Sequence, residues 1–122
     1  MVCGFGGLIL VVIYIIWEFR VKKNKRKQFG SYYSSSGKWA LLFQKSSAYQ
    51  ETILVQDTEH ADRYFVIDLW KDIDSFRSFK REYTEEYEAM DKKCEEFTEE
   101  ERCLGFFAST ETRKSQNNKR IP

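Results

Sequence analysis

The residues of this chain that could carry chemistry are few, and one carboxylate stands out among them. Asp68 lies in the run Tyr64–Trp70 (YFVIDLW), where apolar and aromatic residues flank it. A carboxyl group buried in such a run has a raised pKa and can act as a general base. The alternative is that Asp68 pairs with Arg20 or another cation, or faces solvent at a sheet edge. Further candidates are Tyr64 and Tyr83 as catalytic groups, and Trp39, Phe43, Trp70, Phe79 and Arg20 as substrate-binding residues. For the aromatic residues the alternative is plain core packing.

No other type of catalytic or metal site is predicted. The cysteines Cys3, Cys94 and Cys103 form no CxxC or Cys/His pair, and the single histidine, His60, lies in a polar turn. A nucleophilic cysteine needs a base beside it, and a metal site needs converging ligands. Phosphate-binding glycine loops and nucleophilic triads are also absent from the sequence. An odd number of cysteines without a disulfide framework favours a reducing compartment, so we expect a cytoplasmic protein without metal or cofactor.

Composition predicts one folded domain. The 122 residues are 42% hydrophobic and 16% aromatic, which suits a single core and argues against disorder. The net charge of +1 gives no bulk attraction to nucleic acid. The charge is uneven, however, because basic residues gather between Arg20 and Lys27. This cluster is either a solvated loop and helix start or a contact for phosphates or anionic lipid.

The N-terminal apolar run allows two interpretations. Residues 1–17 carry no charge and basic residues follow, as in a membrane anchor or an uncleaved signal. A spanning helix needs about 20 apolar residues, and this run is shorter and contains glycines. Its β-branched and aromatic residues, with the alternation that continues to Val21, favour a buried central strand. Residues 1–9 would then be an extra leader, and the alternative is a membrane-associated protein anchored through residues 5–17.

A short helix and a hairpin are predicted next. The helix follows from three apolar residues at i, i+3 and i+4: Trp39, Leu42 and Phe43. Ser36 is its expected N-cap, and the serine-rich break before it predicts that the first helical region, from Phe29, is interrupted. Gln50–Gln56 (QETILVQ) and Tyr64–Trp70 have the composition of strands. The polar turn Asp57–Arg63 between them predicts a hairpin.

The second helical region carries the clearest periodicity in the chain. One helical face holds seven apolar or aromatic residues: Phe76, Phe79, Tyr83, Tyr87, Met90, Cys94 and Phe97. We expect one long helix that begins at a cap near Asp72 or Asp74 and ends near Phe97. Its stripe is expected to be core rather than a cofactor site.

The C-terminal part is predicted to return to the sheet. Thr98–Glu101 has the spacing of a capping box, which predicts a separate short helical turn ended by Gly105. Leu104–Ser109 is the last predicted strand. Residues 110–122 are polar and are expected to form a disordered basic tail.

The resulting order, β-α-β-β-α-β, predicts an α+β ferredoxin-like fold, with a four-stranded antiparallel sheet and both helices on one face. The first and third strands carry apolar residues on both sides, so the helix-free face is expected to be apolar. Because large exposed apolar faces are uncommon on monomers, we expect a second copy of the chain to cover this face and form a symmetric homodimer.

An ordered set of segments resembles the antibiotic biosynthesis monooxygenase-like family of the dimeric α/β-barrel superfamily. The segments are WEFRVK at 17–22, GKWALLF at 37–43, YQET at 49–52, YFVIDLW at 64–70, and the stretch 87–107 with YEAMD, CE and LGFF. They span about residues 10–109, so the resemblance implies one domain of this family there. The chain departs from the family pattern at Ser34–Ser36, where a turn containing Gly or Asp is usual.

The resemblance implies a dimeric barrel and chemistry on small molecules. Relatives include cofactor-free oxygenases of polyphenolic or quinol-like substrates and enzymes that degrade haem. Haem degraders present a histidine from the second helix, which this chain lacks there, so haem is not expected. A cofactor-free oxygenase needs aromatic walls and a polar group that takes a proton, the role that Asp68 would fill. We therefore predict a cofactor-independent monooxygenase of a small aromatic molecule. The alternative is a non-catalytic dimeric binding or structural module of the same fold.

Overall fold

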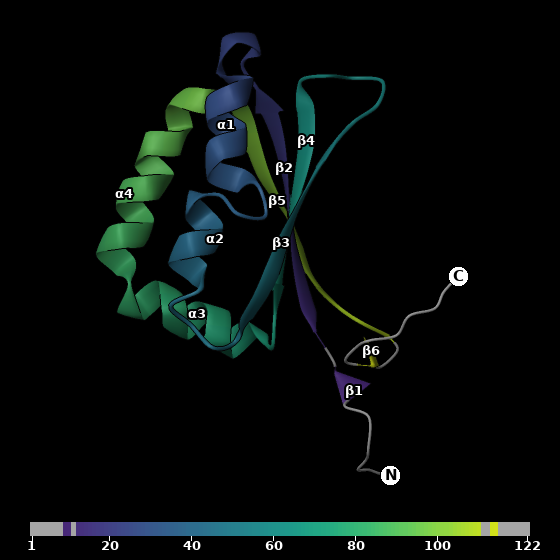
Figure 1. Ribbon diagram of the computed structural model, residues 1–122, viewed down its shortest axis with the longest axis vertical. Helices are drawn as coiled ribbons and strands as arrows, with labels where there is room; N and C mark the ends of the chain where they lie inside the picture. The colour runs from purple at the N-terminus through teal and green to yellow at the C-terminus, as the bar shows by residue number, and fades with distance from the viewer. Residues whose placement is uncertain (1–8, 11, 111–112, 115–122) are drawn as a thin grey trace.

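The helices of this protein all lie on one face of an antiparallel sheet (Figure 1). The computed structural model describes residues 9–10, 12–110 and 113–114. Its elements are β1 (Ile9–Leu10), β2 (Ile13–Val21), η1 (Lys23–Lys25), α1 (Arg26–Tyr33), α2 (Lys38–Phe43), β3 (Tyr49–Gln56), β4 (Arg63–Trp70), α3 (Ile73–Glu82), α4 (Thr84–Cys94), η2 (Glu95–Phe97), β5 (Thr98–Ala108) and β6 (Arg113–Lys114). The main sheet has the order β3-β4-β2-β5. The predicted ferredoxin-like fold is confirmed.

Strand β2 is the central strand that the sequence predicts. It pairs antiparallel with β4 on one side, from Ile13 opposite Trp70 to Arg20 opposite Arg63. On its other side it pairs with β5. Residues 13–17 of the alternative membrane anchor are therefore part of the sheet, whereas residues 5–8 lie outside the described residues. None of the helices that the structure describes is long and apolar enough to cross a membrane.

The two ends of the described chain meet in a small second sheet. Ile9 of β1 pairs with Lys114 of β6, and Leu10 pairs with Arg113. Most of the predicted leader, residues 1–9, and of the predicted tail, residues 110–122, lies outside the described residues. Both therefore stay predictions.

The first helical region is interrupted, as predicted, but its second part begins differently. Gly37, not Ser36, is the N-cap of α2, and it makes no side-chain capping hydrogen bond. The predicted cap at Ser36 is therefore wrong. The turn is instead set by a close approach, because a Cβ on Gly37 would lie 2.7 Å from the Tyr32 carbonyl oxygen. Only glycine fits against the end of α1 in this way.

The second helical region is two helices rather than one. The predicted cap is present, because Asp72 Oδ1 accepts a hydrogen bond from the Ser75 N–H at 2.7 Å. The helix then breaks at Tyr83, whose φ and ψ are −114° and 38°. Beside the break, the Thr84 hydroxyl donates to the Lys80 carbonyl oxygen at 2.7 Å and competes with the regular helical pattern. The prediction of a single long helix is wrong, although the apolar stripe still faces the core.

The C-terminal segment contains the largest error in the sequence-based prediction. Thr98–Glu101 belongs to strand β5 and forms no helical turn. Pairing with the central strand overrides the local capping signal, since Glu101 lies opposite Phe19 and Arg102 opposite Glu18. Gly105 is not a helix C-cap. It has a φ of +140° and sits at a register shift between the pairs made by Ile16 and Trp17, as glycine often does in a β-bulge.

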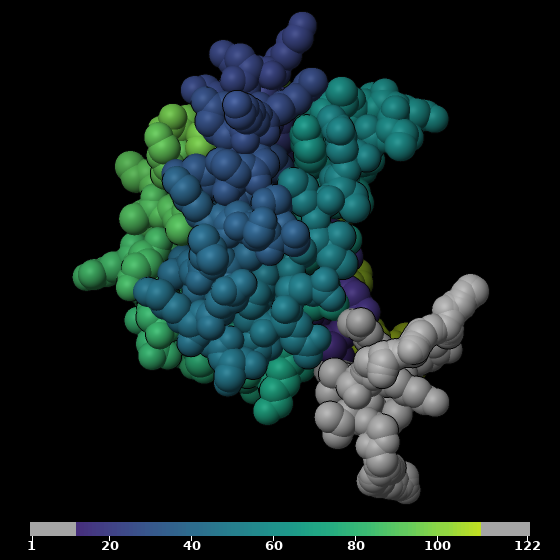
Figure 2. All heavy atoms as spheres, in the orientation of Figure 1, coloured from purple at the N-terminus to yellow at the C-terminus, as the bar shows by residue number. Residues whose placement is uncertain are grey.

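The core fills the space between the helices and the sheet. It is unusually aromatic, and its fully buried side chains include Trp70, Phe19, Phe29, Phe79 and Phe97. Figure 2 shows the segments from η1 to β3, in blue, packed between α4 in green and the β4 hairpin in teal. This packing fixes the helix-covered face of the sheet, where the candidate site lies.

Candidate functional site

Asp68 lies in the middle of β4 and points to the helix-covered face. It is 4% exposed. Thr52 Oγ1 on β3 donates to Asp68 Oδ1 at 2.6 Å, and Trp17 Nε1 on β2 donates to Oδ2 at 3.2 Å. Since the Thr52 hydroxyl gives its proton to Asp68, Tyr49 is the donor of the 2.7 Å bond between Tyr49 and Thr52. Burial raises the pKa of the Asp68 carboxyl to about 6, although both hydrogen bonds act to lower it.

Asp68 has no cationic partner among the ion pairs of the described residues. Arg20, the partner that the sequence suggested, instead pairs with Asp62, with 3.2 Å between Nη1 and Oδ1. Its neighbour across the strands is Arg63, so it lies on the helix-free face of the sheet. The pairing of Asp68 with Arg20 is therefore wrong, and Arg20 does not reach this site.

A small pocket adjoins Asp68, between the sheet and helices α1, α2 and α4. Ten residues line it: Trp17, Phe19, Tyr33, Trp39, Phe43, Val66, Asp68, Tyr87, Asp91 and Glu101. Six of them are aromatic, and three are carboxylic acids. The pocket volume is about 30 Å³. That is room for about two water-sized groups. It admits one functional group of a ligand, not a whole ring.

The two outer acids of the pocket come from elements that approach it from different sides. Asp91 lies on α4 and Glu101 on β5. Burial raises the pKa of each carboxyl, and for both the charge of Glu95 adds to the effect. Burial also raises the pKa of Tyr87, and the negative charges of Asp91, Asp68 and Glu101 add to that rise. The pocket is thus lined by aromatic rings and by acidic side chains that concentrate negative charge in it.

One buried donor at the pocket is unsatisfied. Trp39 Nε1 has no hydrogen-bond partner in the described part of the chain, although Trp39 is 5% exposed. A buried N–H without an acceptor costs stability unless something fills the role. The Trp39 N–H faces the Tyr33 hydroxyl and the Cys94 thiol, since it acts to lower the pKa of both groups. Tyr33, like Trp39, lines the pocket.

The structure brings together only part of the predicted site. Trp39 and Phe43 line the pocket with Asp68. Trp70 and Phe79 belong to the core behind it, with ring centroids 5.3 Å and 5.4 Å from that of Phe43. The remaining two predicted residues, Tyr64 and Tyr83, lie elsewhere. Tyr64 packs on Phe29, and Tyr83 packs on Phe79 beneath the Lys45 ammonium.

Sequence reasoning missed several residues of the pocket and also Thr52, the hydrogen-bond partner of Asp68, which was within reach. The predicted hairpin turn, residues 57–63, is centred on His60. Reflecting Asp68 through that centre gives Thr52, its cross-strand neighbour in the structure. Tyr33, Asp91 and Glu101 carried no such signal, because they reach the pocket only through the packing of α1, α4 and β5.

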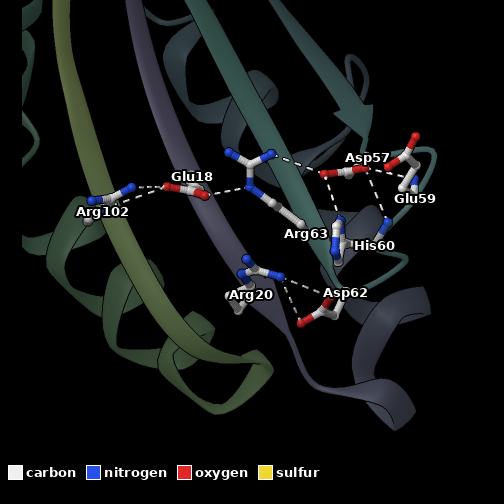
Figure 3. Close-up of polar contacts among 8 residues, drawn as sticks. All are labelled: Glu18, Arg20, Asp57, Glu59, His60, Asp62, Arg63 and Arg102. Carbon is white, nitrogen blue, oxygen red and sulfur yellow. Dashed lines mark hydrogen bonds and ion pairs between the residues drawn. The ribbon is translucent and has the colours of Figure 1, made fainter.

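A second polar cluster lies on the opposite, helix-free face, and sequence reasoning missed it as well (Figure 3). Glu18 accepts hydrogen bonds from Arg63 Nε, at 2.6 Å, and from Arg102. Arg63 Nη1 also binds Asp57 Oδ2 at 3.0 Å. Hydrogen bonds from Arg102 and Arg63 lower the pKa of Glu18 to about 2. These charges are mutually satisfied, so this cluster has the character of a structural network rather than a reactive site.

The geometry of the site bears on two kinds of chemistry, metal binding and general-base catalysis. In the described residues, no group of three or more His, Cys, Asp or Glu side chains is arranged to hold a metal ion. Asp68, by contrast, has the properties of a general base, since its pKa of about 6 leaves it ionised near neutral pH and able to accept a proton.

Comparison with known proteins gives structural matches only. No family model matches the sequence, and no curated protein matches it. A "Putative antibiotic biosynthesis monooxygenase from Nitrosomonas europaea" superposes with a TM-score of 0.62 at 14% identity, covering 88% of this chain and 95% of the other. A protein of the same description from Bordetella bronchiseptica gives 0.61 at 15% identity, with 82% and 96% covered. A conserved protein from Methanosarcina mazei Go1 gives 0.59 at 13% identity, with 84% and 94% covered. The chain therefore has the ferredoxin-like fold of the antibiotic biosynthesis monooxygenase-like proteins.

Proposed function

We propose that the protein is a cofactor-independent monooxygenase of a small hydroxylated aromatic molecule, with Asp68 as its general base. The observation that carries the proposal is a buried carboxylate at an aromatic pocket, with its pKa raised to about 6 and no cationic partner among the described residues. The likeness in fold to proteins named as monooxygenases supports it.

In this proposal one hydroxyl of the substrate enters the pocket. It donates its proton to Asp68, which acts as the general base. The electron-rich substrate anion reduces dioxygen directly. Where the reacting carbon is an activated methylene, it forms a C–O bond to dioxygen and becomes a hydroperoxide. The O–O bond then breaks as the second hydrogen leaves, so that the methylene becomes a carbonyl. One oxygen atom stays in the product, and the other leaves as water.

The rest of the substrate has to lie outside the pocket. A surface groove of about 310 Å³ borders the pocket and shares Tyr87 and Asp91 with it. Grooves of roughly this size hold small ligands. The substrate ring would lie there, with its hydroxyl directed inward to Asp68.

Oxygen uptake on a panel of quinols and hydroxylated aromatics tests the proposal. We expect uptake by the wild type and a loss of about a hundredfold or more in Asp68→Asn, because the amide cannot take the proton. Glu96→Gln, which alters an exposed ion pair with Lys93, is the control and should keep full activity. Equal uptake by wild type and Asp68→Asn, or no uptake on any compound, would contradict the proposal.

The second candidate is a non-catalytic binding or structural module of the same fold. The volume of the pocket, about 30 Å³, favours it. Typical ligand pockets measure roughly 300–1,000 Å³. Binding of hydroxylated aromatics without any oxygen uptake would support this candidate over the enzyme.

We also propose that the protein is a homodimer through the helix-free face of the sheet. Apolar residues that pair across the strands on this face remain exposed, among them Ile53, Val55 and Phe107. A second copy would cover them, as the fold otherwise leaves this face without helices (Figure 1). We expect a dimer in sedimentation and a monomer for Val55→Glu with Phe107→Glu. Leu41→Glu, at a more exposed apolar residue on α2, is the control and should remain dimeric. A monomeric wild type would refute the dimer.

We propose a cytoplasmic location as well. Cys94 and Cys103 are both free thiols, as is usual in a reducing compartment.

A further inference from the structure

The acids of the pocket bear on the charge of its ligand. Asp68, Asp91 and Glu101 all line it, and no ion pair within the described residues includes any of them. The pocket therefore concentrates negative charge next to the place where the proposed substrate would become an anion. Two like charges close together in a poorly solvated site repel strongly.

The walls of the pocket favour the opposite charge. Its aromatic side chains present π-electrons, and a cation within about 6 Å of such a ring is attracted by it. Tyr87 already holds one cation in this way, since Lys80 Nζ lies 4.8 Å from its ring centroid. Carboxylates and aromatic rings together form the usual surroundings of a protonated amine.

The three acids of the pocket are buried to different extents, so a ligand has an inner and an outer position available to it. Asp68 is almost fully buried, whereas Asp91 is only half-buried and Glu101 lies on an exposed stretch of the edge strand β5. The inner position meets Asp68, with the ring of Trp39 in the pocket wall, and a buried carboxylate suits a hydroxyl group. The outer position, where the groove begins, meets Asp91 and Tyr87, with Glu101 nearby in the pocket lining.

We infer that the ligand of this pocket is a hydroxylated aromatic molecule that carries a protonated amine, with the hydroxyl directed to Asp68 and the amine to Asp91 and Glu101. The inference rests on the proposed function only in using the same pocket as the substrate site. The cation on the ligand compensates the two outer carboxylates. It also offsets the negative charge that develops when the hydroxyl loses its proton.

Lys80 is the protein's own competitor for the outer position. Its charge lowers the pKa of Asp91, against the effect of burial, although the two side chains form no ion pair. The ammonium rests instead over the rings of Phe76 and Tyr87. If Lys80 competes with the ligand amine, Lys80→Ala should tighten amine binding, which makes this variant a useful second measurement.

Three probes with the same ring and hydroxyl but different charges test the inference: 2-(2-aminoethyl)phenol, 2-ethylphenol and 2-hydroxyphenylacetate, whose two substituents lie on the same side of the ring. Binding is followed in the full chain by nuclear magnetic resonance of the tryptophan indole N–H groups. Trp17 and Trp39 line the pocket and should shift, whereas Trp70 lies in the core and serves as an internal control. We expect 2-(2-aminoethyl)phenol to bind at least about fivefold more tightly than 2-ethylphenol, and the acid to bind most weakly.

The double variant Asp91→Asn with Glu101→Gln should abolish the preference for 2-(2-aminoethyl)phenol over 2-ethylphenol, and Glu96→Gln should leave it unchanged. Equal binding of the charged and neutral probes, a preference that survives the double variant, or no shift of Trp17 and Trp39 with any probe would each overturn the inference. Oxygen uptake separates the two proposals. Selective binding of the amine without oxygen uptake would contradict only the proposed oxygenase activity. Oxygen uptake on neutral quinols without a preference for the amine would contradict only this inference.

Discussion

Asp68 and Glu18 are almost equally buried on opposite faces of one sheet, and their pKa values move in opposite directions. Asp68, at 4% exposed, forms no ion pair within the part of the chain that the structure describes, and burial raises its pKa to about 6. Glu18, at 8% exposed, lies between Arg63 and Arg102, and its pKa falls to about 2. Burial alone does not determine the charge of a carboxyl group. The partners that the sheet register places beside it do.

The comparison also separates two uses of a buried charge. On the helix-free face each charge is satisfied, and the network joins three strands, since Glu18 is on β2, Arg63 on β4 and Arg102 on β5. On the helix-covered face the carboxylate keeps the capacity to accept a proton. We therefore assign a structural role to one face and a chemical role to the other.

The largest expected effect is a gain of stability in Asp68→Asn. The folded-state pKa of about 6 lies above the usual 3.8, so the folded protein holds this proton more tightly than the unfolded chain does. Ionised Asp68 therefore costs stability at pH 7, by about 2 to 3 kcal/mol, and the cost fades as the pH falls toward 4. In urea unfolding we expect the variant to be more stable at pH 7 and equal to wild type near pH 4. A variant that is less stable than wild type at both pH values would show that ionised Asp68 does not destabilise the fold.

A smaller effect of opposite sign is expected for Glu18→Gln, since its network is partly open to solvent. The folded pKa of about 2 lies below the usual 4.5, so the ionised form stabilises the fold above pH 4.5. That stability is lost as the pH falls from 4.5 through about 2. The variant should be less stable than wild type at pH 7, and the difference should shrink in acid. Glu96→Gln is the control, and a pH-independent difference would argue against the ion pairs as its cause.

The two arginines of the network should contribute unequally to the stability of the fold. The Arg63 side chain is 33% exposed and binds both Glu18 and Asp57, whereas the Arg102 side chain is 72% exposed and binds Glu18 alone. Exposed pairs contribute little because water and salt screen them. We expect Arg63→Ala to lower the urea midpoint more than Arg102→Ala, and added salt to reduce both effects. Equal losses of stability in the two variants would mean that exposure does not weaken the ion pair of Arg102, which joins the edge strand β5 to β2.

The smallest expected effect concerns the pKa of Asp68 itself. The hydrogen bond from Thr52 acts to lower it, against burial. Thr52→Val removes this donor at nearly constant volume, so the pKa should rise above about 6. A carbon-13 titration of the Asp68 carboxyl measures the change. An unchanged pKa would mean that water replaces the lost hydroxyl.

The sequence predicted the fold through its periodicities. The alternation from Ile13 to Val21 and in YFVIDLW located the paired central strands, and the aromatic stripe located the core face of α3 and α4. The errors occurred where tertiary packing overrides local signals. Thr98–Glu101 has a capping-box spacing, yet the open side of β2 recruits it into the sheet.

The candidate site was less predictable than the fold. Asp68 could be recognised because a carboxylate in an apolar strand is rare in itself. Tyr64 and Tyr83 share a face with core residues, but a shared face does not specify which cavity a side chain lines. The charge partners of Arg20 and Glu18 depend on the register of the paired strands. The sequence predicts that register only for the hairpin of β3 and β4.

The helix break at Tyr83 has a consequence for how the pocket can change size. Figure 1 shows α3 and α4 running in different directions on either side of it. Helix α3 is anchored by Phe76 and Phe79, whereas the only buried residue of α4 is Cys94 at its far end. Segments with few buried contacts open at a lower free-energy cost than the core does. We therefore expect helix α4 to unfold locally more readily than α3. Because it carries Tyr87 and Asp91, its amide exchange rates would report how often the pocket opens beyond the volume of two waters.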